Sequence, residues 1–474
     1  MISEREQAIK EFVSSGDYCL KSGVFLVGGA SRSAIYDINT GNVYSLNKSA
    51  DKILTEQTED VEFWKKLAEM GLAGPSEEKG DSILPELLRK PSLQFVWFEV
   101  VSNDCNESCI HCYAECMPPT YRKAMGFTVE EDGVSNPKQE KDKKISFEKW
   151  KQLIDETYSL GCRRCQFIGG EPFLYRGENS KTVLDLAEHA QSIGYEFIEI
   201  FTNGTLLTGE KVQRIKELGL NVAVSLYSND EKIHDSITKT PGSFKKTKEA
   251  LMLLKEADVP VRVETVLMGP NEQTIEETQK FVEEMEFSHK QPDVLRPKGR
   301  GDDPSIMPTK ETVVKYGLML SPSFSITRDI LSRNISGHSC LLGKITITDN
   351  GDVLPCIFSR NLIVGNVQET TIKEIVFGQK LEAVWKSTKD NVLVCQDCEY
   401  KYACFDCRPL SEGVNQGKGE YLTAPYPRCT YNPYTGGWAK GVWGVDGKGK
   451  PYYDETLRLE IEEVMAIEKG GEKK

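Results

Sequence analysis

Strand-like and helix-like segments alternate along the middle of this 474-residue chain, and this alternation restricts the fold more than any other feature. The strand candidates are FEVVSN, CQFIGG, EFIEIFTNG, NVAVSLYS, VRVETVLM and DVLRP. Amphipathic stretches such as SFEKWKQLIDETYSL and KTVLDLAEHAQSI lie between them and favour helices. Six repeats of this kind predict an α/β fold over residues 93–300, with a parallel sheet in a partial (β/α)6 TIM-like barrel. Functional groups of such a barrel lie on the loops that follow the strands.

The flanking segments differ in character. Residues 1–92 combine short strand candidates with two helical stretches and end in a polar linker, which predicts a small winged-helix-like module. Residues 301–445 are rich in Cys, Gly and Pro, so bound metal is expected to supply part of their stability. Residues 446–474 read as a final helix and a charged tail, and residues 117–144 as an inserted surface loop. Four apolar side chains are expected in the core of the first module: Leu54, Phe63, Trp64 and Leu67.

Composition narrows the classes of partner. The chain has 59 basic and 72 acidic residues, a net charge of −13, which argues against nucleic acid as the main partner. It has no apolar run of membrane-spanning length, and its charged start, MISEREQAIKEF, does not resemble a signal peptide. We therefore expect a cytoplasmic protein without a membrane partner, in which thiols stay reduced.

The chain has 14 cysteines, which in a reduced compartment indicate metal or redox chemistry rather than disulfides. Cys105, Cys109 and Cys112 directly follow the first predicted strand. Three thiolates at this spacing can bind three irons of a cubane cluster and leave the fourth iron open. The alternative is a zinc site completed by His111 or Cys116.

Together with the loops after the later strands, this motif resembles the radical S-adenosylmethionine (SAM) enzymes. The resemblance implies that the GGEP motif after the second strand holds the SAM amino group and that the TNGT loop follows on the SAM side. It also implies that a serine on the fourth strand contacts the ribose or carboxylate, and that the backbone of the sixth meets adenine. The SAM-binding residues predicted in this way are Gly169, Gly170, Glu171, Pro172, Asn203, Ser225 and Leu295.

The same resemblance implies the chemistry. The cluster held by the predicted catalytic residues Cys105, Cys109 and Cys112 binds SAM at its open iron and passes it one electron. The products are methionine and a 5′-deoxyadenosyl radical, which takes a hydrogen atom from the substrate. A flavodoxin- or ferredoxin-type reductant is expected to supply the electron.

A second cysteine array occupies the C-terminal part of the chain, with two CxxC pairs separated by five residues: Cys340, Cys356, Cys395, Cys398, Cys404, Cys407 and Cys429. On its own, the CxxC pair arrangement is compatible with a zinc knuckle. Beside a radical SAM barrel it resembles the SPASM domain, which implies two auxiliary clusters and three [4Fe-4S] clusters in total. By order, one auxiliary cluster is assigned to Cys395, Cys398, Cys404 and Cys429. The other is assigned to Cys340, Cys356 and Cys407.

Seven cysteines leave the eighth SPASM ligand open. Either one iron has no protein ligand, or another side chain fills the position: His338, Asn334, Asp406 or Cys116. Cys162 and Cys165 are expected to be buried structural thiols, with a role as hydrogen donor as the alternative. The basic stretch 296–301 ends the sixth strand, where it suits an anionic cofactor or a substrate carboxylate.

The first module indicates the substrate. Strands followed by helices ahead of a radical SAM barrel resemble modules that bind the leader of a ribosomally made precursor peptide as an added strand. The predicted function is therefore an oxidoreductase that installs a thioether or carbon–carbon crosslink in such a peptide. Alternatives are a formylglycine maturase of the sulfatase type, a peptide epimerase with a cysteine hydrogen donor, and a non-enzymatic zinc-binding scaffold.

Overall fold

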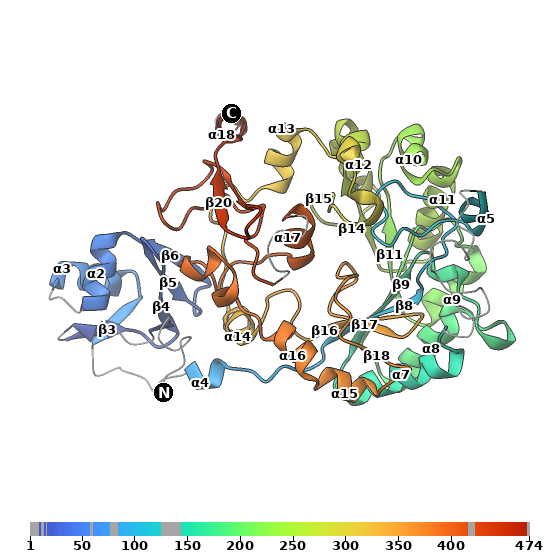
Figure 1. The fold of residues 1–474 in the computed structure, drawn as a ribbon, viewed down its shortest axis with the longest axis horizontal. Coiled ribbons are helices and arrows are strands. Elements are labelled where there is room, and N and C mark those ends of the chain that lie inside the picture. Colours follow the sequence, from blue (N-terminus) through green and yellow to red (C-terminus); the bar gives the residue numbers. More distant parts are fainter. Residues whose placement is uncertain are drawn as a thin grey trace. The chain divides into compact units, whose positions relative to one another are not determined.

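The computed structural model describes residues 9–10, 14–15, 17–56, 60–75, 84–124, 144–415 and 422–471 (Figure 1). The chain divides into two compact units. Unit 1 comprises Met1–Pro91, Leu318–Leu342 and Ala383–Lys474, and unit 2 comprises Ser92–Gly317 and Gly343–Glu382. Residues 76–83 of the predicted linker and residues 125–143 of the predicted insertion at 117–144 lie outside the described residues.

Unit 2 is built on a nine-stranded sheet in which six parallel strands, the first five of them predicted, lie side by side in chain order. They are β8 (Phe95–Val101), β9 (Arg164–Gly169), β10 (Phe197–Thr202), β11 (Asn221–Ser225), β12 (Val261–Glu264) and β14 (Ser288–His289). Each pairs with its neighbour in parallel, so all carboxyl ends lie at one edge of the sheet. The loops that carry the predicted SAM and cluster residues follow these ends, as the alternation predicts.

Helices connect the strands and cover the sheet (Figure 1). They are α7 (Phe147–Ser159), α8 (Val183–Ile193), α9 (Gly209–Glu217), α10 (Glu231–Thr238), α11 (Ser243–Glu256) and α12 (Ile275–Glu284). Helix α7 begins at Ser146, whose side chain accepts a hydrogen bond from the Lys149 N–H, and buries an apolar face. Its Trp150 packs edge-on against Phe98 of β8, with ring centres 6.0 Å apart. The core of unit 2 therefore lies between the helices and the sheet.

The sixth predicted strand, at residues 293–297, does not join this sheet, and its place is taken by β14, which the sequence did not indicate. Strand β14 pairs with β12, while β15 (Asp293–Val294) pairs with β13 (Val266–Leu267), in the segment that continues β12. Leu295 follows β15, and its N–H donates to the carbonyl of Leu267. Leu295 therefore lies directly after β15, beside the segment that continues β12.

Three strands from the cysteine-rich segment extend the same sheet, which the sequence did not indicate. Strand β16 (Lys344–Thr348) pairs in parallel with β8, and β17 (Asp352–Leu354) and β18 (Gly365–Asn366) add antiparallel strands beside it. The helices that follow are α15 (Ile372–Val376) and α16 (Gln379–Trp385). Cys356 therefore lies just after a strand of unit 2 and is buried.

The N-terminal part of unit 1 contains the predicted strands and helices. Strands β1 (Ile9–Lys10), β4 (Val24–Gly28), β5 (Ser33–Asp37) and β6 (Asn42–Leu46) form an antiparallel sheet in that order. Strands β2 (Ser14–Ser15), β3 (Tyr18–Leu20) and β7 (Ala73–Pro75) form a second sheet, and the helices are α2 (Lys48–Glu56) and α3 (Val61–Glu69). Leu54, Trp64 and Leu67 are buried as predicted, and Phe63 packs partly buried at the edge of their cluster.

The other face of the β1–β4–β5–β6 sheet packs against the C-terminal segment of the same unit. Phe25, Val27 and Tyr36 share an apolar cluster with Tyr400 and Tyr431. The Tyr36 hydroxyl donates to the carbonyl of Glu399 over 2.8 Å, and the Ala30 N–H donates to the carbonyl of Asp397 over 2.7 Å. The N-terminal sheet is thus an integral part of unit 1.

Short elements complete both units: α4 (Leu84–Leu87), α5 (Pro119–Ala124), α13 (Lys310–Thr312), α14 (Arg328–Ser336), α17 (Arg408–Asn415), β19 (Val442–Val445), β20 (Pro451–Asp454) and α18 (Arg458–Gly471). Helix α18 agrees with the predicted C-terminal helix. Among the described residues, no helix combines the length and apolar character needed to cross a membrane.

Candidate functional site

The three cysteines of the first motif lie in the loop after β8, and all are free thiols. Cys105 is buried, while Cys109 and Cys112 are partly exposed. The loop is held on the end of α10, because the N–H groups of Ser108 and Ile110 donate to the carbonyls of Thr238 and Ile237. Four neighbouring carbonyl and amide groups therefore fix the path of the motif.

Arg300 holds the same loop from the other side. Its Nε donates to the Cys109 carbonyl over 2.9 Å, and its Nη2 donates to the Cys116 carbonyl over 2.7 Å. Gly299 has φ +55°, and a Cβ there would lie 2.7 Å from the Cys112 carbonyl oxygen. The basic stretch, expected to face an anion, instead places Arg300 as a clamp on the cysteine loop.

The charge of Arg300 also lowers the pKa values of neighbouring side chains. A hydrogen bond from the Cys116 thiol lowers the pKa of Cys112 against the effect of burial, and Arg300 lowers it further. Burial and Arg300 lower the pKa of His111 to about 3, so its ring is neutral. A thiolate is the form in which cysteine binds iron, and the clamp favours that form at Cys112.

Gly169 and Gly170 bring the second strand-end loop against the first. A Cβ on Gly169 would lie 2.1 Å from the Val101 carbonyl oxygen, and one on Gly170 would lie 2.1 Å from that of Asp104. No side chain fits at either position. The sequence argument assigned these glycines to close contact with a ligand; the structure shows that they are needed for close contact between the two loops.

Glu171 connects the second loop to the third. Its carboxylate is buried and accepts hydrogen bonds from the Phe173 N–H, the Thr202 hydroxyl and the Asn203 N–H, at 2.8–3.0 Å. Burial raises the pKa of Glu171, and these donors act in the opposite direction. The carboxylate, expected to meet an ammonium group, therefore has three partners within the protein; binding of SAM by the GGEP motif stays a prediction.

Asn203 completes the connection to the cysteine loop. Its Nδ2 donates to Asn106 Oδ1 over 3.0 Å and lies 3.8 Å from the Cys105 sulfur. The Asn106 Nδ2 in turn donates to the Thr205 hydroxyl over 2.6 Å. The loops after the first three strands thus form one hydrogen-bonded group around Cys105.

The remaining predicted SAM residues lie on the later strands. Ser225 ends β11 and is partly exposed. Leu295 is buried in an apolar cluster with Tyr227, and Cys109 packs against that cluster. The segments that follow β11 and β15 therefore pack beside the cysteine loop, and contact of Ser225 and Leu295 with SAM stays a prediction.

Asn106 and Glu107 are site residues that the sequence argument missed, although both lie inside the cysteine motif. Glu107 is 1% exposed, and its Oε1 has no hydrogen-bond partner among the described residues. Burial raises its pKa to about 8. The signal that could have identified Glu107 is a charged residue between two predicted cysteine ligands. The same sequence is equally compatible with a side chain exposed to solvent.

Replacing Glu171 with glutamine tests the loop connection. The amide can accept fewer of the three hydrogen bonds and leaves a buried donor without a partner, so the variant should lose about 1–3 kcal/mol of stability. SAM affinity should fall with it, because the second and third loops no longer hold each other. Thermal denaturation and calorimetric SAM titration measure the two effects. Glu249→Gln, at an exposed position of α11, is the control and should change neither quantity; equal behaviour of the two variants would contradict the role.

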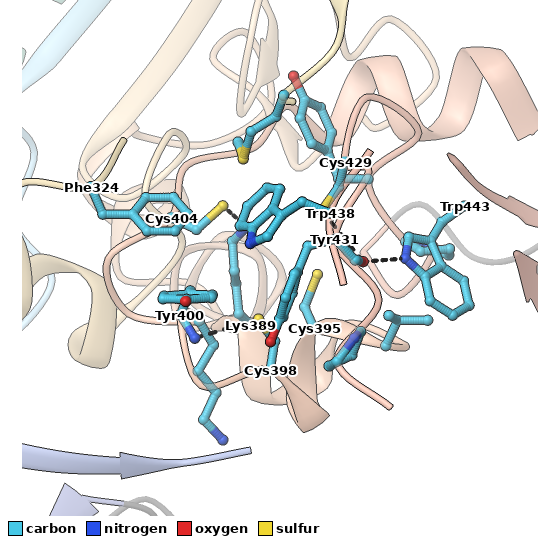
Figure 2. Close-up of a pocket in the computed structure, with 16 residues that line it drawn as sticks. Phe324, Lys389, Cys395, Cys398, Tyr400, Cys404, Cys429, Tyr431, Trp438 and Trp443 are labelled. Carbon is cyan, nitrogen blue, oxygen red and sulfur yellow. Dashed lines mark hydrogen bonds between the residues drawn. The ribbon is translucent and has the colours of Figure 1, made fainter. Parts of the chain in front are cut away.

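Four cysteines of the second array line a single cavity in unit 1, as Figure 2 shows: Cys395, Cys398, Cys404 and Cys429. Tight turns bring the first three together, because the Cys398 N–H donates to the Cys395 carbonyl and the Cys404 N–H to the Tyr400 carbonyl. These are the residues that the sequence assigned to one auxiliary cluster. Among the described residues, no three His, Cys, Asp or Glu side chains are grouped as ligands of a single metal ion.

Aromatic rings form the wall of this cavity. Tyr431 and Trp438 pack with ring centres 4.7 Å apart, and Tyr400 packs on Phe324 at 4.9 Å and on Tyr431 at 5.2 Å. Burial in this apolar surrounding raises the pKa values of the Cys395, Cys398 and Cys429 thiols. Four free thiols in an apolar cavity fit a cluster of the [4Fe-4S] type, whose irons would stabilise the thiolate form.

The other three cysteines are divided between the units: Cys340 and Cys407 belong to unit 1 and Cys356 to unit 2. Their assignment to one cluster stays a prediction. Two candidates for its missing ligand bind each other, since His338 Nε2 lies 2.8 Å from Asp406 Oδ1. The second His338 nitrogen accepts the Cys340 N–H over 3.1 Å, and the second Asp406 oxygen pairs with Arg408. In this arrangement both side chains are already engaged with protein groups.

The other candidates and the leftover thiols have protein surroundings. Cys116 donates to the Ser102 carbonyl over 3.0 Å, and the Asn334 amide donates to the Tyr402 carbonyl over 2.7 Å. Cys162 and Cys165 are fully buried, which agrees with structural thiols.

Comparison with known proteins supplies two domain matches. Residues 100–285 match the Radical SAM superfamily, and residues 340–399 match SPASM, an iron–sulfur cluster-binding domain. These matches confirm the predicted fold class of a radical SAM α/β domain with an SPASM domain. The winged-helix-like character of residues 1–92 stays a prediction.

Several characterised proteins are similar over most of the chain. The AdoMet-dependent heme synthase of Methanosarcina barkeri is 25% identical over 359 residues, covering 69% of this chain and 94% of the relative. The antilisterial bacteriocin subtilosin biosynthesis protein AlbA of Bacillus subtilis is 24% identical over 335 residues, covering 67% of each. Among solved structures, native anSMEcpe with bound AdoMet aligns with a TM-score of 0.50 and 18% identity, covering 72% of this chain and 94% of that one.

Proposed function

We propose that this radical SAM enzyme, which carries an SPASM iron–sulfur domain, forms a thioether or carbon–carbon crosslink in a ribosomally made precursor peptide. When bound, SAM and its cluster would supply a 5′-deoxyadenosyl radical that removes one hydrogen atom from the peptide. An auxiliary cluster would accept the electron that is left when the crosslink closes and a proton is released. The proposal assigns Cys105, Cys109 and Cys112 to the SAM-binding cluster. The protein contributes position and exclusion of water.

The observation that carries the proposal is the composition of unit 1. It unites a cysteine-lined cavity with an antiparallel sheet whose last strand in order, β6, pairs only with β5 among the described strands. An open strand edge can bind an extended peptide through main-chain hydrogen bonds, which suits a leader of varied sequence. The similarity to AlbA, a bacteriocin biosynthesis protein, supports the same substrate class.

Proline substitutions on β6 test the docking edge. The N–H groups of successive strand residues point to opposite sides, so one of Val43 and Tyr44 faces β5 and the other faces the open edge. Val43→Pro and Tyr44→Pro should therefore differ. Both variants lose some side-chain packing, because Val43 and Tyr44 lie partly buried against apolar clusters. The variant whose N–H faces β5 should lose further thermal stability, and the other should weaken precursor binding at least tenfold, about 1.4 kcal/mol. Fluorescence anisotropy with a labelled leader and a melting curve separate these effects.

Asn42→Ala is the control, because it alters an exposed side chain of β6 and keeps the N–H. Unchanged leader affinity in both proline variants would exclude β6 as the docking edge. Point substitutions are preferable to removal of residues 1–92, because removal would expose the apolar cluster that Phe25 and Tyr36 share with Tyr400.

The reaction itself is tested with the full-length reduced enzyme, SAM and the candidate precursor. Crosslinking should lower the peptide mass by two hydrogens without producing an aldehyde. Loss of two hydrogens with a hydrazide-reactive product would indicate a formylglycine maturase acting on serine. Incorporation of one solvent deuterium without net oxidation would indicate an epimerase, with Cys116, Cys162 and Cys165 as candidate donors.

Heme synthesis is the second candidate, favoured by the match to nearly the whole length of the AdoMet-dependent heme synthase. That match leaves roughly a third of this chain unaligned, since it covers 69%. Anaerobic incubation with SAM and Fe-coproporphyrin III, followed by heme detection, compares the two functions directly. Heme formation without peptide modification would replace the peptide proposal.

The proposed setting follows from the chemistry. Iron–sulfur clusters and reduced thiols suit the cytoplasm, where a flavodoxin- or ferredoxin-type protein can supply the electron. The proposal assigns three [4Fe-4S] clusters, one that binds SAM and two auxiliary.

A further inference from the structure

Lys389 lies in the same cavity as the four cysteines Cys395, Cys398, Cys404 and Cys429, hereafter the four-cysteine cavity. It begins the short helix η8 (Lys389–Asn391), and its side chain is 7% exposed. Its Nζ donates to the Cys404 sulfur over 3.4 Å, as Figure 2 shows. A buried ammonium group in contact with a proposed cluster ligand requires an explanation, because isolated buried charge is costly.

Charge around Asp406 gives part of that explanation. This fully buried carboxylate pairs with Arg408 and His338, and Lys389 Nζ lies 3.6 Å from its Oδ2. Lys389 and Arg408 bring two positive charges against the one negative charge of Asp406. One positive charge is therefore not balanced by Asp406. Because Lys389 also contacts Cys404, the thiolates of a bound cluster would balance that charge.

Lys401 provides an internal comparison. It lines the same cavity and is equally buried, at 7% side-chain exposure. Its Nζ, however, lies 3.0 Å from Asp390 Oδ1 and donates to the Gln396 carbonyl. Lys401 is thus neutralised by its own carboxylate, whereas Lys389 directs a hydrogen bond to a cysteine sulfur.

We infer that Lys389 raises the reduction potential of the cluster held in the four-cysteine cavity, through its hydrogen bond to Cys404 and its positive charge. The reduced cluster carries one more negative charge than the oxidised one, so an adjacent cation stabilises the reduced form. Hydrogen bonds to cluster sulfurs act in the same direction, and the 7% exposure of the Lys389 side chain limits the screening of either effect by solvent. The inference rests on the proposed assignment of a cluster to these four cysteines. A higher reduction potential would make that cluster a better electron acceptor during crosslinking than it would be without Lys389.

The experiment measures potentials in protein that lacks the SAM cluster, with Cys105, Cys109 and Cys112 replaced by alanine. Auxiliary clusters are reconstituted anaerobically, iron and sulfide are counted, and midpoint potentials are determined by titration followed with electron paramagnetic resonance. Lys389→Met should move one of the two auxiliary potentials to a more negative value and leave the other unchanged. Lys389→Arg, which keeps charge and donor, should remain near the parent, and Lys401→Met should give a smaller shift.

Unchanged potentials in Lys389→Met at full iron content, or equal shifts in Lys389→Met and Lys401→Met, would overturn the inference. If Lys389→Met does not fold, the parent protein labelled with 15N-lysine decides the question by electron–nuclear double resonance. A lysine nitrogen coupling that disappears in Lys389→Arg supports the contact, and absence of any coupling excludes it. Failure of the cluster assignment itself is recognised separately, because Cys398→Ala with Cys429→Ala would then leave the iron content unchanged.

Discussion

Replacing Cys105, Cys109 and Cys112 together with alanine should abolish 5′-deoxyadenosine formation and remove about four iron atoms per chain, one cubane. The three thiols lie on one loop that Arg300 and the end of α10 hold in place, and the neighbouring Cys116 thiol alone cannot replace three ligands. The protein should stay folded, since the loop's carbonyl contacts do not depend on the thiols. Chromatographic assay of 5′-deoxyadenosine and iron analysis after anaerobic reconstitution measure the two losses.

The matched control replaces Cys162 and Cys165, which are fully buried away from the proposed ligand set, and should keep the full iron content. SAM cleavage retained in the triple variant, or equal iron loss in the control, would remove the assignment of this loop to the SAM cluster.

Cys398→Ala combined with Cys429→Ala should separate SAM cleavage from product formation. Both thiols line the four-cysteine cavity, and their loss leaves two ligands for a cluster that needs four. Iron should fall by about four atoms per chain, and the yield of crosslinked peptide should fall at least tenfold because the cluster proposed as the better electron acceptor is lost. Formation of 5′-deoxyadenosine should continue, since the cysteine loop after β8 is unchanged.

The same double variant should also melt at a lower temperature, because metal binding contributes to the folding free energy of a segment with little regular structure. Lys389→Arg, which keeps the four thiols, is the control for a change in this cavity. Crosslinked peptide at the parental rate in the double variant would show that this cluster does not take part in the reaction.

Several contacts of the site connect residues that are far apart in the sequence. Glu99 of β8 forms a buried bidentate pair with Arg360, at 2.6 and 2.8 Å, across 261 positions. Arg300 holds the carbonyl of Cys109 across 191 positions. The sequence around Arg360 or Arg300 does not indicate which group either side chain contacts. The basic stretch 296–301 was therefore expected to bind an external anion. Only the fold shows that Arg300 donates to backbone carbonyls of the chain itself and that Arg296 pairs with Asp293.

Local periodicity by itself determined the α/β class and the order of the first five strands over 93–300, because that signal lies within a few residues. The cysteine motifs indicated the radical SAM and SPASM domains through their resemblance to known families. The tertiary structure alone decided that β16–β18 extend the sheet, that Gly169 and Gly170 serve contact between loops, and that Lys389 meets Cys404. These features depend on which loops pack together when strand ends converge. The partner of a buried charged or hydrogen-bonding group depends on which residues the fold brings close to it, and the spacing of residues in the sequence does not predict that partner.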